Sequence, residues 1–247
     1  MKHIAVGLEL NRLDEYLLNY LNRTSSFLKP TAVTFFNIHQ EELAPAILQK
    51  FPELTDSIDT HYIKEMVHET ANLKKLTAEL HYKAITGNVL KNILHIANAD
   101  DTDLLILGRK KNKEERHLQF KEIIRNAVSD VLIVPEYKVE KHTTILVAID
   151  YSVYSKDALL KAMDIAKHAD LKLVIQHVYE VPIGYSKTGK SFVEFAKIMK
   201  GHAENHMKDF VKDIDLSEVN HEFKYTLNDH HSTSKAIKSA IEESYPQ

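Results

Sequence analysis

Short runs of apolar residues alternate with longer amphipathic stretches along the whole chain. One run, at 3–9, ends in a carboxylate, and a matching run at 144–150 begins 141 residues later. Continuously apolar runs of this length are typical of strands buried on both faces of a sheet. A helical pattern with apolar residues at i, i+3, i+4 and i+7 follows both runs, and Asn11 and Ser152 are the expected helix N-caps. The two segments therefore predict an internal repeat.

The same alternation continues in both halves of the chain. We expect further strands at 32–38, 81–86, 103–108 and 131–135 in the first half and at 171–178 and 222–227 in the second. Long amphipathic stretches at 55–80 and 191–214 return the chain to the sheet. Strands that alternate with helices, without hairpin signals, predict parallel sheets covered by helices on both faces. The expected fold class is α/β, with two tandem doubly wound units of strand order 3-2-1-4-5.

A polar segment at 137–143 is the expected linker, which predicts a first domain at 1–137 and a second at 142–247. Counted from the first half, a fourth strand of the second half would begin near residue 248, past Gln247. We therefore expect the second domain to lack its fourth and fifth strands and to be incomplete at its C-terminus. An open strand edge is a pairing hazard. This predicts a homodimer or exchanged strands, unless the chain is a truncated form of a longer one.

Composition narrows the function classes. The 32 basic and 35 acidic residues give a net charge of −3, which argues against nucleic acid or an anionic membrane as the main partner. The absence of cysteine excludes disulfides and thiol catalysis. Apolar runs are too short for a signal peptide or for the roughly 20 residues of a spanning helix. We expect a cytoplasmic protein.

The chain resembles the tandem universal stress proteins (UspA-like), and the likeness covers nearly its whole length. The matching residues are 147–150, Ser152, 158–159, 176–178, 103–108 and 130–135. The resemblance implies two adenine nucleotide alpha hydrolase-like units in a cytoplasmic, usually dimer-forming module that is induced under stress. It also implies ATP as a ligand of some members.

The ATP-binding members of that family carry a loop of the form G-x2-G-x9-G-[S/T] after the fourth strand, where glycines let backbone amides approach phosphates. Gly108 matches the first glycine, but Lys111 and Lys121 stand at the other two positions. Glu9 replaces the aspartate that resembles the family's nucleotide contact, whereas Asp150 keeps it in the second half. We expect no phosphate cradle in the first half. For Asp150, a nucleotide contact and a cap on the following helix both remain open.

The second half contains a literal G-x4-G-K-[S/T] string, formed by Gly184, Gly189, Lys190 and Ser191. In such a loop the backbone cradles phosphates, the lysine binds the terminal phosphates and the serine binds magnesium. However, the string begins several residues after the preceding strand, and no later strand supplies an aspartate for the metal. The alternative is an ordered turn that starts a helix.

Histidines offer a second kind of chemistry. His202 and His206 lie one turn apart on an expected helix, and His230 and His231 follow an expected strand, so that a zinc site is conceivable if they meet. The alternative is a half-buried packing role for His206 and surface positions for the others, and we expect no metal. No nucleophile motif is present, so an enzyme has no positive support.

We therefore expect a non-catalytic universal stress protein that acts as a stress-response or regulatory module, with a first half that is degenerate for ATP binding and no cofactor. Its expected partners are a second copy and an unidentified regulatory protein. The alternative is a nucleotide-binding switch that uses Asp150 or the 184–191 loop. A third hypothesis, a weak phosphohydrolase, relies on the same loop.

Overall fold

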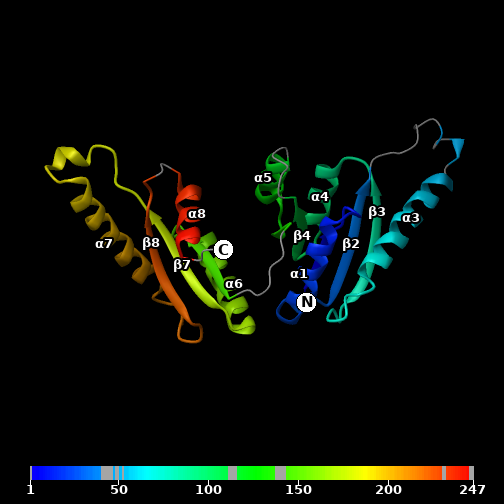
Figure 1. The fold of residues 1–247 in the computed structure, drawn as a ribbon, viewed down its shortest axis with the longest axis horizontal. Coiled ribbons are helices and arrows are strands. Elements are labelled where there is room, and N and C mark those ends of the chain that lie inside the picture. The colour runs from blue at the N-terminus through cyan, green and yellow to red at the C-terminus, as the bar shows by residue number, and fades with distance from the viewer. Residues whose placement is uncertain are drawn as a thin grey trace. The chain divides into compact units, whose positions relative to one another are not determined.

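The computed structural model describes residues 2–39, 47, 50–51, 53–110, 116–136, 143–229 and 232–244. The chain divides into two compact units, Met1–Val139 and Glu140–Gln247 (Figure 1). The expected domain boundaries at 137 and 142 lie outside the described residues. In the described part of the chain, no helix is both long and apolar enough to cross a membrane.

The first unit is a five-stranded parallel sheet flanked by helices. Its strands are β1 (His3–Gly7), β2 (Ala32–His39), β3 (Glu79–Thr86), β4 (Leu104–Arg109) and β5 (Asp130–Pro135), and its helices are α1 (Leu13–Leu28), α3 (Glu53–Thr70), α4 (Val89–Ala97) and α5 (Arg116–Asn126). The strands lie side by side in the order β3-β2-β1-β4-β5, and every pair is parallel. This confirms the expected α/β fold class and the doubly wound strand order.

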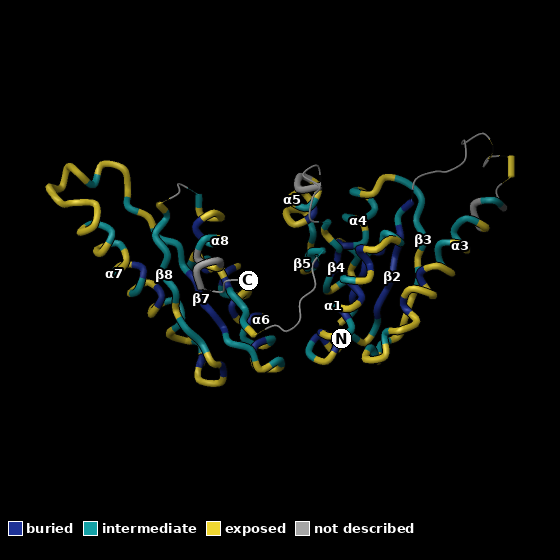
Figure 2. The backbone as a smooth tube through the Cα atoms, viewed as in Figure 1, coloured by how far each residue is buried: buried dark blue, intermediate teal, exposed yellow. Residues whose placement is uncertain are grey.

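Each face of this sheet has its own apolar core. Because successive strand residues point to opposite faces, Ile4 joins the core under α1 and α3 while Ala5 joins the core under α4 and α5. Leu17 of α1 and Met66 of α3 are fully buried on the first face, and Ile123 of α5 is buried on the second. Figure 2 shows buried residues running along β2 in the middle of the sheet. Burial on both faces explains why the strands read as continuous apolar runs.

The second unit contains a smaller parallel sheet. Its elements are β6 (Thr144–Ile149), α6 (Val153–Ala169), β7 (Lys172–Tyr179), the 3₁₀ turn η1 (Tyr185–Thr188), α7 (Phe192–Val211), β8 (His221–Leu227) and α8 (Thr233–Ser244). The described strands are ordered β6-β7-β8, so β6 is an edge strand. In the first unit, β1 is the strand equivalent to β6, and it pairs with β4 as well as with β2. The described part of the second unit contains three strands, and the lack of a fourth and fifth stays a prediction.

The two faces of the second sheet differ in polarity. Leu159 of α6 and Met207 of α7 are buried against the strands on one face. On the other face, Gln176 of β7 is 1% exposed and occupies the place that Phe36 has in the first unit. Its Nε2 donates to Thr226 Oγ1 at 2.9 Å, while its Oε1 has no hydrogen-bond partner. Gln176 therefore places a buried polar side chain on a face of the sheet where the first unit has an apolar one.

The internal repeat is visible in backbone geometry that the sequence pattern does not report. Among the described residues other than glycine, four have positive φ: Leu10 at 52° and Lys29 at 45°, then Tyr151 at 66° and Asp170 at 52°. Each residue of the first pair lies 141 positions before its counterpart in the second. Left-handed backbone costs such residues about 1–2 kcal/mol each. Both units therefore make the same strained turn after their first strand and the same left-handed stop after their first helix.

The structure confirms one of the two expected helix N-caps. Ser152 is the N-cap of α6, and its Oγ accepts a hydrogen bond from the Ser155 amide at 3.1 Å, which confirms the prediction. The N-cap of α1 is Arg12, so the prediction of Asn11 is wrong by one residue. The Asn11 Oδ1 still accepts a hydrogen bond from the Leu13 amide at 2.9 Å. The hydrogen bond of Asn11 spans two residues, as in an Asx turn, whereas that of Ser152 spans three, as in a helix cap.

Candidate functional site

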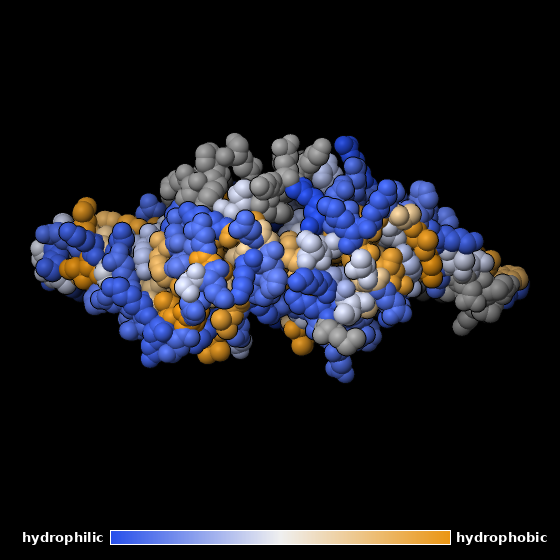
Figure 3. Space-filling view, turned by 90° about the horizontal axis from the view of Figure 1, so that it is seen from below, coloured by the Kyte–Doolittle hydropathy of each residue, from blue (hydrophilic) through white to orange (hydrophobic). Residues whose placement is uncertain are grey.

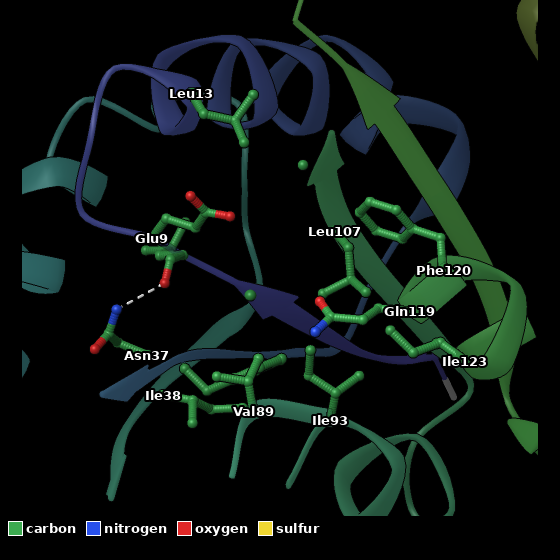
Figure 4. A pocket seen from close by; sticks show the side chains of 14 residues that line it. Glu9, Leu13, Asn37, Ile38, Val89, Ile93, Leu107, Gln119, Phe120 and Ile123 are labelled. Carbon is green, nitrogen blue, oxygen red and sulfur yellow. Dashed lines mark hydrogen bonds between the residues drawn. The ribbon is translucent and has the colours of Figure 1, made fainter. Parts of the chain in front are cut away.

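A pocket of about 520 Å³ opens at the carboxyl edge of the first sheet, between the ends of β1 and β4. In open α/β sheets this is the position where the strand order reverses and ligands bind. The lining residues are Gly7, Leu8, Glu9, Leu13, Phe36, Asn37, Ile38, Val89, Ile93, Leu107, Gly108, Gln119, Phe120 and Ile123. Figure 4 shows side chains of α1, α4 and α5 arranged around the opening. The pocket is therefore a candidate ligand site.

Two glycines in the pocket floor are required by side-chain packing. A Cβ placed on Gly108 would lie 2.8 Å from Leu13 Cδ2, and one on Gly7 would lie 2.8 Å from Leu107 Cδ2. Real Cβ atoms do not approach so closely, so a side chain at either position would displace the floor. Gly108 does not have positive φ. Gly108, which matches the first glycine of the family's loop, is therefore needed for the close packing of α1 on β4.

The polar groups at the pocket are paired among themselves. Glu9 Oε2 lies 3.0 Å from Lys110 Nζ and accepts a hydrogen bond from Asn11 Nδ2 at 2.9 Å. Asn37 Nδ2 donates to the Leu8 carbonyl at 2.8 Å, while its buried Oδ1 has no hydrogen-bond partner. The charges at the mouth therefore neutralise each other, and the one unsatisfied polar atom in the wall is an acceptor.

A buried carboxylate beside the pocket occupies the amides of the loop after β1. Asp14 is 1% exposed and accepts hydrogen bonds from the amides of Glu9 at 3.1 Å, Leu10 at 2.6 Å and Asn11 at 3.4 Å. Burial raises the pKa of Asp14 to about 6, because desolvation outweighs the stabilisation of the charged form by the Leu10 and Asn11 amides. These amides are consequently unavailable to an external anion.

The sequence carried little signal for Asp14, since it reads as an ordinary acidic residue in the first turn of a helix. Its counterpart 141 residues later is Ser155, which is also buried. A comparison of the two halves at this position could have drawn attention to the carboxylate. Its contacts with the loop amides depend on the left-handed backbone of Leu10, which no residue type in the loop announces.

The predicted site residue Asp150 lies exposed at the end of β6, directly before Tyr151. Its Oδ1 accepts a hydrogen bond from the Ser152 amide at 2.9 Å, and hydrogen bonds from Ser152 hold the pKa of Asp150 below its usual value. This contact spans two residues and forms an Asx turn directly before Ser152, the N-cap of α6. Nearby, His177 Nδ1 lies 2.8 Å from the Ile149 carbonyl, which repeats the contact of Asn37 with Leu8 in the first unit.

The 184–191 segment forms a turn followed by a helix start. Gly184 and Gly189 have φ of 92° and 72° and flank the single 3₁₀ turn η1. The Tyr185 ring contacts Phe192 and Phe195 of α7, with centroids 5.6 and 6.1 Å away. Apolar side chains also reach the surface around this turn, visible at one end of Figure 3, with Ile183 fully exposed. The glycines therefore supply left-handed turn geometry.

Ser191, which the motif would place on magnesium, is instead the N-cap of α7. Its Oγ accepts the Glu194 amide at 3.3 Å and donates to Glu194 Oε2 at 2.7 Å, and its own amide donates to the same carboxylate oxygen at 2.8 Å. These hydrogen bonds lower the pKa of Glu194, which keeps the carboxylate charged. Lys190 is exposed beside this pair. The S-x-x-E spacing of a capping box was readable in the sequence.

The histidines of the second unit do not converge within the described residues. His202 and His206 are both exposed on α7, and the buried stripe passes through Met207. The expectation of a half-buried His206 is therefore wrong: Ala203 and Phe210 lie on the expected stripe, but Met207 and not His206 is buried between them. The rings of His206 and Tyr151 are perpendicular, with their centroids 5.8 Å apart. Among described residues, no group of three or more potential ligands could hold a metal, and 230–231 lies outside them.

Comparisons with known proteins found similarity among solved structures. No protein-family model matches the sequence, and no curated protein matches it either. A universal stress protein from Archaeoglobus fulgidus is similar in structure, with a TM-score of 0.64 and 15% identity over 98% of this chain and 81% of that one. A protein of unknown function from Pseudomonas aeruginosa PAO1 has a TM-score of 0.61 and 10% identity over 99% of this chain and 78% of its own.

At these identities the likeness concerns the fold. The chain has the parallel-sheet α/β fold of universal stress proteins in its five-stranded unit, together with a second, three-stranded sheet. The alignment to the Archaeoglobus protein extends over 98% of the chain and therefore includes residues of both units.

Proposed function

We propose that this protein is a non-catalytic tandem universal stress protein that acts as a regulatory module in a stress response. The proposal is supported by the fold and by the 98% of the chain that aligns with a universal stress protein. The recurrence of the left-handed turns 141 residues apart supports the tandem arrangement. The described residues that line the pocket include no nucleophile paired with a base, which fits a binding site and not a catalytic one.

In this proposal the first unit does not hold ATP as the family's nucleotide-binding members do. The observation that carries it is that the Asp14 carboxylate already takes the amides of the loop after β1, so that this loop offers no free donors to an anion at the pocket. Lys110 is paired with Glu9 at 3.0 Å and so offers less charge to a phosphate. Gly108 is followed by Arg109 and Lys110, with no second glycine before Gly184.

We further propose a cytoplasmic homodimer that signals through a protein partner. Support for a second copy comes from β6, whose outer edge carries no paired strand among the described residues. Its residues Val147 and Ile149 are buried on the α6 face, so the strand is a regular, pairing-competent edge. Light scattering of the full chain tests this, and a stable monomer at micromolar concentration would contradict it.

The decisive experiment for the function is thermal unfolding with and without ATP and magnesium. A nucleotide present at 100 times its dissociation constant adds about 2.7 kcal/mol to stability. We expect no shift for the transition of the first unit. A shift that belongs to the first unit would contradict the proposal, and release of phosphate from ATP would contradict its non-catalytic character.

The alternative is a nucleotide-binding switch in the second unit, at Asp150 or the 184–191 loop. The observation in its favour is that both Asp150 and Lys190 are exposed, so a ligand could reach them. Lys190→Ala and Asp150→Ala should then abolish an ATP-dependent shift of the second transition. Lys187→Ala is the matched control, because Lys187 lies in the same turn but outside the lysine position of the motif. An equal effect of Lys187→Ala and Lys190→Ala would indicate charge attraction without a built site.

A further inference from the structure

We propose that the pocket at the carboxyl edge of the first sheet binds an uncharged, largely apolar small molecule, in place of a nucleotide. The inference rests on the proposed function and names the ligand class of the module's first unit. It follows from three features of the pocket: the apolar side chains in its walls, its volume, and the pairing of Glu9 with Lys110.

Most lining residues are aliphatic or aromatic, although polar atoms make up a similar share of the lining surface. Nine of the 14 lining residues are apolar: Leu8, Leu13, Phe36, Ile38, Val89, Ile93, Leu107, Phe120 and Ile123. Figure 4 shows Val89 and Ile93 of α4 facing Phe120 and Ile123 of α5 across the opening. Burying the apolar part of an uncharged ligand against these side chains favours binding.

The volume suits a molecule of two or three fused rings. A dry apolar cavity of about 150 Å³ is large enough for benzene, and small-molecule sites typically measure about 300–1,000 Å³. The pocket, at about 520 Å³, falls within that range. Val89 is 39% exposed and Gln119 is exposed, so the rim between α4 and α5 is open to solvent. A ligand can therefore enter without unfolding the unit.

The described charges at the pocket disfavour an anion. Glu9 is paired with Lys110 at 3.0 Å, so the lysine does not stand free to attract phosphate. The loop amides point to Asp14, and the unsatisfied polar atom of the wall, Asn37 Oδ1, is an acceptor. Acceptors repel phosphate oxygens, whereas a neutral ligand experiences no such penalty. The pocket thus discriminates against phosphorylated ligands with the same residues that close it to ATP.

A matched pair of probes tests the ligand class. 2-Naphthol is an uncharged fluorescent compound of two fused rings. 2-Naphthyl phosphate carries the same rings with a dianionic phosphate group. In fluorescence titrations of the full chain, we expect saturable binding of 2-naphthol and at least tenfold weaker binding of the phosphate. Absence of saturable 2-naphthol binding, or equal affinity for the two probes, would overturn the inference.

Variants locate the binding in the pocket. Ile93→Asp places a charge in the wall and should weaken 2-naphthol binding at least tenfold. Ile124→Asp is the control, because Ile124 is 57% exposed on α5 and does not line the pocket. Val89→Phe fills the rim without adding charge and should also weaken 2-naphthol binding. It provides the test of the pocket if Ile93→Asp fails to fold. Unchanged affinity in Val89→Phe would overturn the assignment to this pocket.

The failure of this inference can be told apart from failure of the proposed function. If 2-naphthol does not bind and ATP does not stabilise the first unit, only the ligand class is wrong. If ATP with magnesium stabilises the first unit and competes with 2-naphthol, the exclusion of nucleotides is wrong, and the proposed function falls with it.

Discussion

Substitution of Gly108 by alanine separates a packing role from a ligand role. The added Cβ would lie 2.8 Å from Leu13 Cδ2, 2.9 Å from Leu13 Cγ and 3.4 Å from Leu17 Cδ1. Leu13 and Leu17 are almost fully buried, so neither side chain can move aside into solvent. Either α1 shifts away from β4 or Leu13 leaves its preferred rotamer. Overpacking of this kind costs about 1–3 kcal/mol.

Urea unfolding of the ligand-free protein measures this cost. Circular dichroism follows the transition, and hydrogen exchange of β1 and β4 assigns it to the first unit. We expect Gly108→Ala to lower the free energy of unfolding by about 1–3 kcal/mol. A glycine that served only to admit a phosphate would tolerate alanine in the absence of ligand.

A double-mutant cycle identifies the contact. Leu13→Ala removes both atoms that the new Cβ meets within 3.0 Å, so Gly108→Ala should cost almost nothing in that background. Gly201→Ala is a control of opposite sign, since a Cβ there meets nothing within 4 Å in the interior of α7. It should stabilise its own unit by about 0.5–1 kcal/mol. A loss below about 0.5 kcal/mol for Gly108→Ala, or a loss unchanged by Leu13→Ala, would refute the steric argument.

Three further predictions follow from the described contacts. Ser191→Ala should destabilise α7 by about 1 kcal/mol in a chemical melt and leave ATP titrations unchanged; a change in nucleotide binding alone would restore the phosphate hypothesis. The folded pKa of Asp14, about 6, lies above its ordinary value of 3.8, so its contribution to stability is full below about pH 4 and is lost as pH rises through 6. The loss should amount to about 3 kcal/mol in a pH series of melts, and Asp14→Asn should remove this pH dependence. Glycine at Lys29 or Asp170, where φ is 45° and 52°, should raise stability by about 0.5–1 kcal/mol each, and a decrease would show that their side chains matter more than the backbone strain.

The positions of the strands along the chain were readable from the sequence because burial on both faces leaves a clear pattern. Runs such as 32–38 and 103–108 contain few polar residues, which is typical of internal strands, and they form β2 and β4. Helix detail was less predictable. Ala203 and Phe210 lie on the expected stripe of α7, but Met207 and not His206 is buried between them, because positions i+3 and i+4 both fall within the width of an apolar helix face.

The candidate site was only partly predictable, for a different reason. Gly108 was identified from the spacing of a loop motif, yet its neighbours in space are Leu13 and Leu17, almost 100 residues earlier in the chain. The 184–191 string matches a phosphate-binding motif in letters alone. Whether Ser191 faces a ligand or caps a helix depends on Glu194, whose carboxylate folds back onto it.

The sequence by itself determined the α/β class and the positions of the strands along the chain, since both depend on local hydrophobic patterning that every residue in a strand or helix reinforces. Tertiary structure alone decided the chemistry of the sheet edge. The burial of Asp14, its capture of the loop amides and its raised pKa arise from the left-handed turn at Leu10 and from the helix packed above it. Desolvation and hydrogen bonding depend on neighbours in space, and a one-dimensional pattern does not contain those distances.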